Sequence, residues 1–329
     1  MRRSRPGNSI SGCELVAVHI QTVMLLSILL CTRNREDKLK QALQSILNLE
    51  IPPAVDYELI VVDNGSTDGT AQLCANLTSQ FNGRMRVVYE PKPGLGGARI
   101  TAASHAAGEI FAFVDDDVVP EKNWLTVIHR EFSADPALQG LSGRVELLDP
   151  RDLPITIRRG TERMQLREVS HTYELFVGAN MIVRAGLARR VGLFDPDFGA
   201  GSPFLSADDT EFLYRCWRHG AKLVYVPDLL VYHDHGRRSL EDKRKLSRAY
   251  AIGRGAFFAK HFCHDANVTK EMYWETRSVL DGKSEWGLQH LLWLYKGFLH
   301  YWAYRTLCEI KAWRPFLLKR LVSTRSAQL

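Results

Sequence analysis

Short apolar stretches alternate with helical stretches through the first 120 residues, and this alternation is the strongest constraint on the fold of the chain. Apolar residues also recur at helical spacing after Arg35, after Ala71 and after Gly94. Runs typical of buried strands cover residues 23–30, 59–62, 86–89 and 110–114. Strands that alternate with helices predict an α/β fold with a parallel sheet covered on both faces.

Three consecutive aspartates, Asp115 to Asp117, follow the fourth of these strands. In open α/β sheets, ligands bind where the strands leave the core. Two carboxylates about 4 Å apart repel by about 1 kcal/mol in water and by about 4 kcal/mol at an effective dielectric constant of about 20. Hard cations such as Mg²⁺, Mn²⁺ or Ca²⁺ would relieve that repulsion. Since side chains alternate along a strand, we expect Asp115 and Asp117 to point one way and Asp116 the other; a solvated acidic turn is the alternative.

The second half of the chain places further acidic residues at a predicted helix start. Ser206 is predicted to cap a helix with Asp208 and Asp209 in its first turn, where the helix dipole favours negative charge. A helix is also predicted after Pro120. The remaining predicted segments are strands at 138–147, 175–183, 223–226 and 229–232, and a charged loop at 149–172.

Two histidines, His233 and His235, end the last predicted strand. Residues two apart on a strand point to the same face, and this spacing also occurs in zinc sites. A histidine is more often a satisfied polar residue than a ligand, but the aspartate cluster favours one of the two as a ligand. We choose His233.

Two local patterns resemble known motifs but lack a residue that those motifs need. The segment that begins at Asp63 resembles a calcium-binding loop, but Asp68 stands where an EF-hand requires glycine. The segment that begins at Gly94 resembles a dinucleotide fingerprint, but Arg99 stands at its third glycine position. Neither motif is predicted here.

Positive charge and tryptophan are concentrated near the end of the chain. From Arg237 onward there are 18 Lys and Arg against 8 Asp and Glu, and five of the seven tryptophans. Apolar residues between Leu288 and Trp302 recur at helical spacing. No apolar run reaches the roughly 18 uncharged residues of a membrane span. A basic, aromatic helix suits a membrane interface; packing on the rest of the chain or on a second subunit is the alternative. No nucleic-acid motif is present, so RNA is a weak candidate partner.

The start of the chain and its cysteines bear on location. Residues 1–22 are predicted to be a flexible leader rather than a signal peptide, because no small-residue cleavage site follows the short apolar stretch 23–30. The six cysteines are scattered and form no Cys-x-x-Cys pair. This pattern indicates reduced thiols and a cytoplasmic location.

With these segments assembled, the chain resembles the inverting glycosyltransferases of family 2, which have a nucleotide-sugar-binding GT-A fold. The resemblance runs from about Leu25 to His235 and rests on several motifs in family order. These are residues 32–36 and 61–70 at two strand ends, Asp115–Asp117 as the Asp-x-Asp motif, 207–212 with its acidic pair, and His233 as the late histidine. It implies a Rossmann-like mixed sheet flanked by helices over residues 23–236, and a mostly helical, basic and aromatic extension over 237–329.

The resemblance also implies roles for the matched residues. Asp209, with Asp208 beside it, would take the proton of the acceptor hydroxyl. Asp117, Asp115 and His233 would hold Mn²⁺ or Mg²⁺, which stabilises charge on the leaving nucleoside diphosphate. The donor nucleotide would contact Thr32, Arg33, Asn34, Glu36, Asp63, Gly94, Arg99, Asp115 and Asp116.

At two positions the chain departs from the family pattern. Ile100 follows Arg99 where the family often has asparagine, and the acidic pair is Asp208-Asp209 where the family more often has Glu-Asp. On local sequence alone, Asp63 would be a turn-forming residue and Arg99 a solvated helix charge.

The predicted reaction is therefore the metal-assisted transfer of a sugar, with inversion, from a nucleotide-diphosphate donor to an acceptor hydroxyl in polysaccharide or glycolipid synthesis. The acceptor would be a saccharide or lipid-linked, and the protein would lie on the cytosolic face of the membrane. Two alternatives stay open: a metal-dependent hydrolase that uses Asp115–Asp117 with His233 and His235, and a non-catalytic nucleotide-sugar-binding module.

Overall fold

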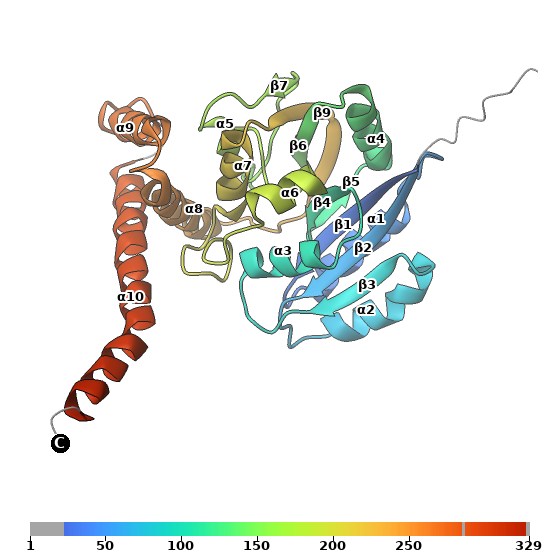
Figure 1. The fold of residues 1–329 in the computed structure, drawn as a ribbon. Helices are drawn as coiled ribbons and strands as arrows, with labels where there is room; N and C mark the ends of the chain where they lie inside the picture. Colours follow the sequence, from blue (N-terminus) through green and yellow to red (C-terminus); the bar gives the residue numbers. More distant parts are fainter. Residues whose placement is uncertain (1–22, 285–286, 327–329) are drawn as a thin grey trace, which may run out of the picture.

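The computed structural model describes residues 23–284 and 287–326, and the side chains of 23–284 and 287–311. The predicted leader, residues 1–22, lies outside the described residues. Within the described part, the strands form one nine-stranded sheet in the order β3-β2-β1-β4-β8-β6-β9-β5, with β7 paired to β9 (Figure 1). The strands are β1 (Met24–Thr32), β2 (Val55–Asp63), β3 (Met85–Tyr89), β4 (Ile110–Asp115), β5 (Val118–Pro120), β6 (Leu138–Leu147), β7 (Met164–Gln165), β8 (Asn180–Arg184) and β9 (Lys222–His233).

Helices cover both faces of this sheet, and three further helices extend away from it (Figure 1). In chain order they are α1 (Glu36–Leu47), α2 (Thr70–Thr78), a 3-10 turn (Ser79–Phe81), α3 (Leu95–Ser104), α4 (Trp124–Ala134), α5 (His171–Glu174), α6 (Ala185–Val191), α7 (Asp208–Arg218), α8 (Leu240–His261), α9 (Ala266–Leu280) and α10 (Leu288–Ser326).

The two cores follow from the alternation of side chains along the buried strands. Ile28 and Leu30 of β1 pack toward α1, α2 and α4, whereas Leu29 and Cys31 pack toward α3, α6 and α7. Because both faces are covered, β4 is apolar from Ile110 to Val114 rather than alternating with polar residues. The amphipathic pattern of α1 arises in the same way, since its buried residues Leu39, Leu43 and Ile46 recur at helical spacing.

The sheet is mixed, as the family resemblance implied, whereas the alternation of strands and helices alone predicted a parallel sheet. β3, β2, β1 and β4 are parallel, but β8 runs antiparallel to both β4 and β6. β8 therefore runs back through the sheet between β4 and β6. The predicted strand 175–183 is correspondingly shorter and begins only at Asn180.

The predicted cap at Ser206 is wrong. The residue before the first turn of α7 is Ala207, which has a left-handed backbone with φ of 66°. The Ser206 hydroxyl instead donates to the Ala249 carbonyl of α8 at 3.0 Å. The hydroxyl therefore joins the sheet domain to α8 rather than capping the start of α7.

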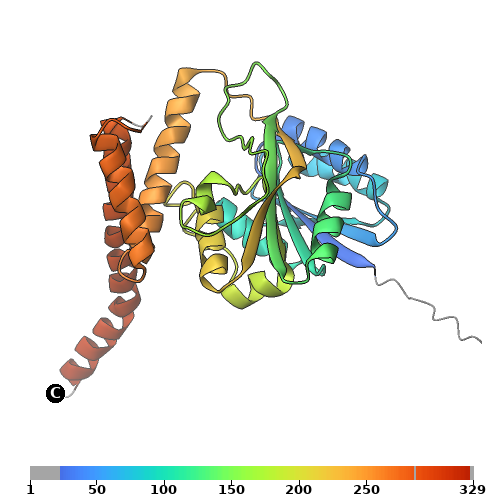
Figure 2. The same cartoon turned by 90° about the horizontal axis from the view of Figure 1, so that it is seen from above.

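The C-terminal extension is helical, as predicted for residues 240–262 and for the apolar periodicity beyond Leu288. A third core contains Phe257 and Phe258 of α8, Leu294 of α10 and Tyr214 of α7. Figure 2 shows α8 lying beside the domain and α10 packed along α8. Among the described residues, no helix has the length and apolarity needed to cross a membrane. The domain boundaries at residues 22 and 236 stay predictions.

Candidate active site

A large cleft opens where the central parallel strands end, as expected for an open α/β sheet. Its volume is about 1450 Å³. It is bounded on one side by the ends of β1, β4 and β9 and the start of α7, and on the other by residues 154–160 and α8. The cleft brings together Asp117, Asp209 and His233, although Asp117 and Asp209 are 92 residues apart in the sequence.

Asp116 and Asp117 share a single arginine, Arg35, which was not among the predicted site residues. Arg35 Nη1 lies 2.9 Å from Asp116 Oδ1, and Arg35 Nη2 lies 2.7 Å from Asp117 Oδ2. The Thr32 hydroxyl also donates to Asp116 Oδ2 at 2.7 Å. Burial raises the pKa of Asp116 to about 7, against the opposing charge of Arg35. Arg35 could have been predicted from its position, because it lies three residues after the end of β1, at the sheet edge where the carboxylates are clustered.

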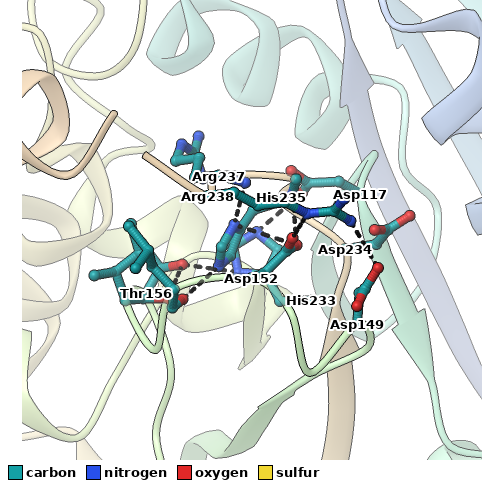
Figure 3. A network of polar contacts seen from close by, with 12 residues as sticks. Asp117, Asp149, Asp152, Thr156, His233, Asp234, His235, Arg237 and Arg238 are labelled. Atoms are coloured by element: carbon teal, nitrogen blue, oxygen red, sulfur yellow. Dashed lines mark hydrogen bonds and ion pairs between the residues drawn. The ribbon is translucent and has the colours of Figure 1, made fainter. Parts of the chain in front are cut away.

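Asp117 also contacts His233, so two of the three predicted metal ligands lie together (Figure 3). His233 Nε2 is 3.1 Å from Asp117 Oδ1, and Nδ1 is 3.0 Å from the Thr156 hydroxyl. Burial raises the pKa of Asp117, but the hydrogen bond and charge of His233 and the charge of Arg35 outweigh it, so the net shift is downward. The Thr156 hydroxyl lies 2.6 Å from the Ile155 carbonyl, to which it donates. It can therefore accept from the Nδ1–H of His233 and orient the ring.

The third predicted ligand, Asp115, belongs to a different group of charges. Asp115 Oδ1 is 2.9 Å from Arg99 Nη2, and Arg99 Nη1 is 2.5 Å from Asp208 Oδ2. The expected alternation of the three aspartates therefore fails. β4 ends at Asp115, and beyond it Asp116 and Asp117 turn toward Arg35. Across residues 23–284 and 287–311, no three His, Cys, Asp or Glu side chains are grouped so as to hold a metal ion.

Arg99 is a buried cation rather than a solvated helix charge. Its side chain is 4% exposed. Burial lowers the pKa of Arg99, but the carboxylates of Asp208 and Asp115 outweigh it and raise the pKa overall. A Cβ at Gly178 would lie 2.5 Å from Arg99 Nη2, so only glycine admits the guanidinium there.

Asp209 lies beside this ion pair and is partly exposed to the cleft. Its Oδ2 accepts from the backbone N–H of Gly178 at 2.7 Å, and its Oδ1 accepts from the N–H of Thr210 at 2.7 Å. Asp208, in contrast, is 4% exposed and is occupied by Arg99.

Three of the predicted donor residues lie outside the cleft lining: Asn34, Glu36 and Asp63. Asp63 Oδ1 accepts from the Ser66 N–H at 2.8 Å, and Asn34 Oδ1 accepts from the Thr67 N–H at 2.7 Å. Asp63 thus forms a local turn, the alternative that its own segment favoured. The other predicted donor residues line the cleft: Thr32, Arg33, Gly94, Arg99, Asp115 and Asp116.

Asn64, which was not predicted, lines the cleft in place of its neighbour Asp63. Its amide oxygen accepts from the Gly94 N–H at 2.9 Å, and its Nδ2 donates to the Glu90 and Lys92 carbonyls at 3.0 and 2.7 Å. Gly94 has φ of 141°, a conformation that favours glycine. Asn64 therefore fixes the loop that leads into α3.

The sequence of the chain matches two related protein families. It matches the family described as Glycosyl transferase family 2 over residues 27–192, and Glycosyl transferase family group 2 over residues 110–321. The first match spans half of the chain, which therefore belongs to glycosyltransferase family 2.

Curated relatives carry the same assignment. Glycosyltransferase AglE of Haloferax volcanii is 24% identical over 213 residues, which cover 64% of this chain and 67% of that protein. The pre-mycofactocin glycosyltransferase of Mycobacterium tuberculosis is 26% identical over 228 residues, which cover 66% of this chain and 44% of that protein. The chain thus spans less than half the length of the second relative. The protein is a glycosyltransferase, as predicted.

Solved structures confirm the predicted GT-A fold. The mannosyltransferase PcManGT from Pyrobaculum calidifontis, in complex with GDP-Man and Mn²⁺, has a TM-score of 0.58 at 22% identity and covers 88% of this chain and 84% of that one. S. aureus TarS, residues 1–349, has a TM-score of 0.54 at 21% identity and covers 74% and 73%.

Proposed function

We propose that this glycosyltransferase moves a sugar with inversion from a nucleoside diphosphate donor to an acceptor hydroxyl, assisted by Mn²⁺ or Mg²⁺. One observation supports this most strongly. The Asp117–His233 pair and Asp209 line the same cleft, together with the Arg99–Asp115 ion pair between β4 and α3. A site for charge on the leaving diphosphate and a proton acceptor for the attacking hydroxyl are both needed for transfer.

Asp209 is the proposed base. In the reaction the acceptor oxygen bonds to the anomeric carbon while the bond from that carbon to the diphosphate breaks, and the electron pair leaves with the nucleoside diphosphate. The hydroxyl proton passes to the Asp209 carboxylate. A single displacement inverts the anomeric configuration. Asp208 is buried against Arg99, so we assign it to positioning rather than to proton transfer.

Asp117 and His233 are the side chains that would hold the divalent cation. A carboxylate oxygen and an imidazole nitrogen in contact form a donor set that Mn²⁺ accepts. When bound, the cation would stabilise negative charge on the diphosphate. Arg35 supplies a fixed positive charge to both Asp116 and Asp117. We assign the nucleotide to the part of the cleft lined by Thr32, Arg33, Asn64 and Gly94.

The Asp209→Asn variant tests this proposal. We expect its kcat to fall by about 10²–10⁴, the usual contribution of general base catalysis. Its Mn²⁺-dependent thermal stabilisation by nucleotide sugars should stay close to that of the wild type, because the donor site is intact. A panel of UDP-, dTDP- and GDP-sugars in the same assay identifies the donor. Asp228→Asn, a surface change, is the matched control.

Two outcomes would contradict the proposal. An unchanged rate in Asp209→Asn would support a non-catalytic or differently organised site. Release of nucleoside diphosphate that does not depend on an acceptor would support the hydrolase instead. Release that requires both donor and acceptor supports transfer.

We also propose that the C-terminal helices attach the protein to the cytosolic face of a membrane, where lipid-linked acceptors of polysaccharide or glycolipid synthesis are located. Large apolar side chains are exposed along α10, with Leu292 71% and Leu299 67% exposed. Basic side chains such as Lys296 and Arg305 lie between them in the sequence. An apolar face with basic residues is typical of helices that bind anionic membrane surfaces.

A further inference from the structure

The cleft is positively charged, although three aspartates lie at its base. Nine Lys and Arg and six Asp and Glu line it. Several of the carboxylates already hold a partner: Asp115 and Asp208 hold Arg99, and Asp116 and Asp117 hold Arg35. The carboxylates of the cleft therefore leave part of its positive charge without a partner.

Five of the nine cations that line the cleft have no carboxylate partner among the side chains that the structure describes. Within the described part of the chain, no carboxylate lies within the 4.0 Å ion-pair distance of these side chains: Arg33, Arg158, Arg237, Lys243 and Arg244. Arg33 follows β1, on the side assigned to the nucleotide. Arg158, Lys243 and Arg244 come from the wall formed by residues 154–160 and α8, and Arg237 comes from the segment after β9.

Arg158 is the most constrained of the five. Its Nη1 and Nη2 donate to the carbonyls of Ile157 and Tyr173 at 2.8 and 2.6 Å, and its Nε has no partner among the described residues. Burial lowers the pKa of Arg158. The positive charge of Arg254 lowers it further, while the negative charge of Asp209 raises it. A guanidinium held by carbonyls alone keeps its charge uncompensated, and an anion would compensate it.

The N-terminal part of α8 supplies further positive charge to the same wall. Lys243, Arg244, Ser247, Tyr250 and Arg254 all line the cleft, and they recur three or four residues apart on one helix face. Lys245 and Arg248 lie on the same helix outside the lining. Lys243 and Arg244 thus face the cleft, whereas Arg248 and Lys245, which pairs with Glu241, do not.

We propose that the acceptor carries a phosphate or diphosphate group, which binds to Arg158, Lys243 and Arg244 while an acceptor hydroxyl faces Asp209. This inference rests on the proposed function, since Asp209 defines where the acceptor hydroxyl lies. The donor diphosphate is assigned to the cation that Asp117 and His233 would hold, so a second anionic group explains why the wall near Asp209 is basic. The volume of about 1450 Å³ exceeds the roughly 300–1,000 Å³ of a pocket for one small ligand.

The test is a titration of the full chain, saturated with Mn²⁺ and with UDP, dTDP or GDP, with three probes. Decyl phosphate represents a lipid headgroup, glucose 1-phosphate a free sugar phosphate, and octyl glucoside a neutral control. We expect at least one phosphate probe to bind and the neutral probe not to bind. The double variant Lys243→Gln/Arg244→Gln should weaken phosphate binding about tenfold, with nucleotide affinity unchanged within about twofold.

The double variant Lys245→Gln/Arg248→Gln removes the same charge from α8 outside the cleft and should bind the probes as the wild type does. Tighter binding of decyl phosphate would identify a lipid acceptor, and tighter binding of glucose 1-phosphate a soluble one. The inference is overturned if neither phosphate binds, if both double variants behave alike, or if Lys243→Gln/Arg244→Gln weakens nucleotide equally. If none of UDP, dTDP and GDP binds the wild type, the proposed donor function fails instead.

Discussion

Glu211 is a carboxylate with no exposed surface, two residues after the proposed base. It lies 3.0 Å from Arg215 Nε and 2.6 Å from Lys260 Nζ. Arg215 also donates to the carbonyls of residues 191–193, and Lys260 to Asp195. One buried carboxylate therefore links α7, α8 and the segment after α6, and its loss would leave two cations with fewer partners.

We expect Glu211→Gln to lower the free energy of unfolding by about 3 kcal/mol at pH 7, because buried cations lose their counter-charge. Burial raises the pKa of Glu211, but His261, Lys260 and Arg215 together lower it to about 2. The folded-state pKa lies below the unfolded value, so the stabilisation is complete above about pH 4.5 and is lost as the pH falls toward 2. Urea unfolding at pH 7 and pH 3 should show a smaller difference between wild type and variant at pH 3.

The matched control for this prediction is Glu241→Gln. Glu241 forms an exposed ion pair with Lys245 on α8, and such pairs contribute about 0.3–0.5 kcal/mol. Its effect should be small at both pH values. An equal difference between wild type and Glu211→Gln at pH 7 and pH 3 would show that the charge of Glu211 does not stabilise the fold.

At the scale of elements, the strands and helices of the first half could be predicted because their apolar periodicity is set by burial on two faces. β6 matches its predicted bounds of Leu138–Leu147. The direction of β8 could not be predicted, because it depends on the path of an irregular segment rather than on local pattern. α9 was not predicted, since only Val268, Met272 and Val279 of its 15 residues are buried.

The same contrast holds for the cleft. Asp115–Asp117, Asp209 and His233 could be placed together because strand ends and a helix start fix their positions. Arg35, Thr156 and Arg158 lie in connecting segments, whose conformation depends on contacts far along the chain. Thr156 has φ of 58° and lies in a loop whose Asp152 accepts from Arg238 Nε and from the Gly236 N–H, both at 2.8 Å, which holds the loop beside the end of β9 (Figure 3).

The contact between α8 and α10 gives a prediction at this scale. A Cβ at Gly297 would overlap the Ile252 carbonyl of α8, and one at Gly255 would overlap the Leu294 carbonyl of α10. We expect Gly297→Ala to lower the free energy of unfolding by about 1–3 kcal/mol, because the two backbones must separate. Urea unfolding measures the change.

Gly186→Ala in α6 is the control for this change. A Cβ at Gly186 would meet no atom within 4 Å. Alanine is preferred to glycine in a helix by about 0.5–1 kcal/mol, so this variant should be at least as stable as the wild type. If Gly297→Ala is equally well tolerated, the close packing of α8 on α10 does not contribute to stability.

At the scale of the whole molecule, the extension made by α8, α9 and α10 has two distinct surfaces. α8 turns basic side chains toward the cleft, whereas α9 and α10 carry exposed apolar ones. A groove between α9 and α10 is lined by Leu280, Leu291, Leu292, Tyr295 and Leu299. A membrane bound along α10 would leave the cleft at the side of the extension, where an acceptor with a phosphate headgroup can reach it.

Membrane attachment predicts that Leu292→Glu/Leu299→Glu weakens binding to phosphatidylglycerol vesicles by about tenfold or more. Each change removes apolar burial of about 1.5–3 kcal/mol and adds a charge that an anionic surface repels. Cosedimentation of the full chain measures the bound fraction, with phosphatidylcholine vesicles to separate the contribution of lipid charge. Tyr89→Glu is the control, because it adds one negative charge at an exposed position on the edge strand β3, away from α10. Equal sedimentation of all three proteins would exclude α10 as the attachment surface. A wild type that is a dimer, with a double variant that is a monomer, would identify a second copy of the chain as the partner of α10.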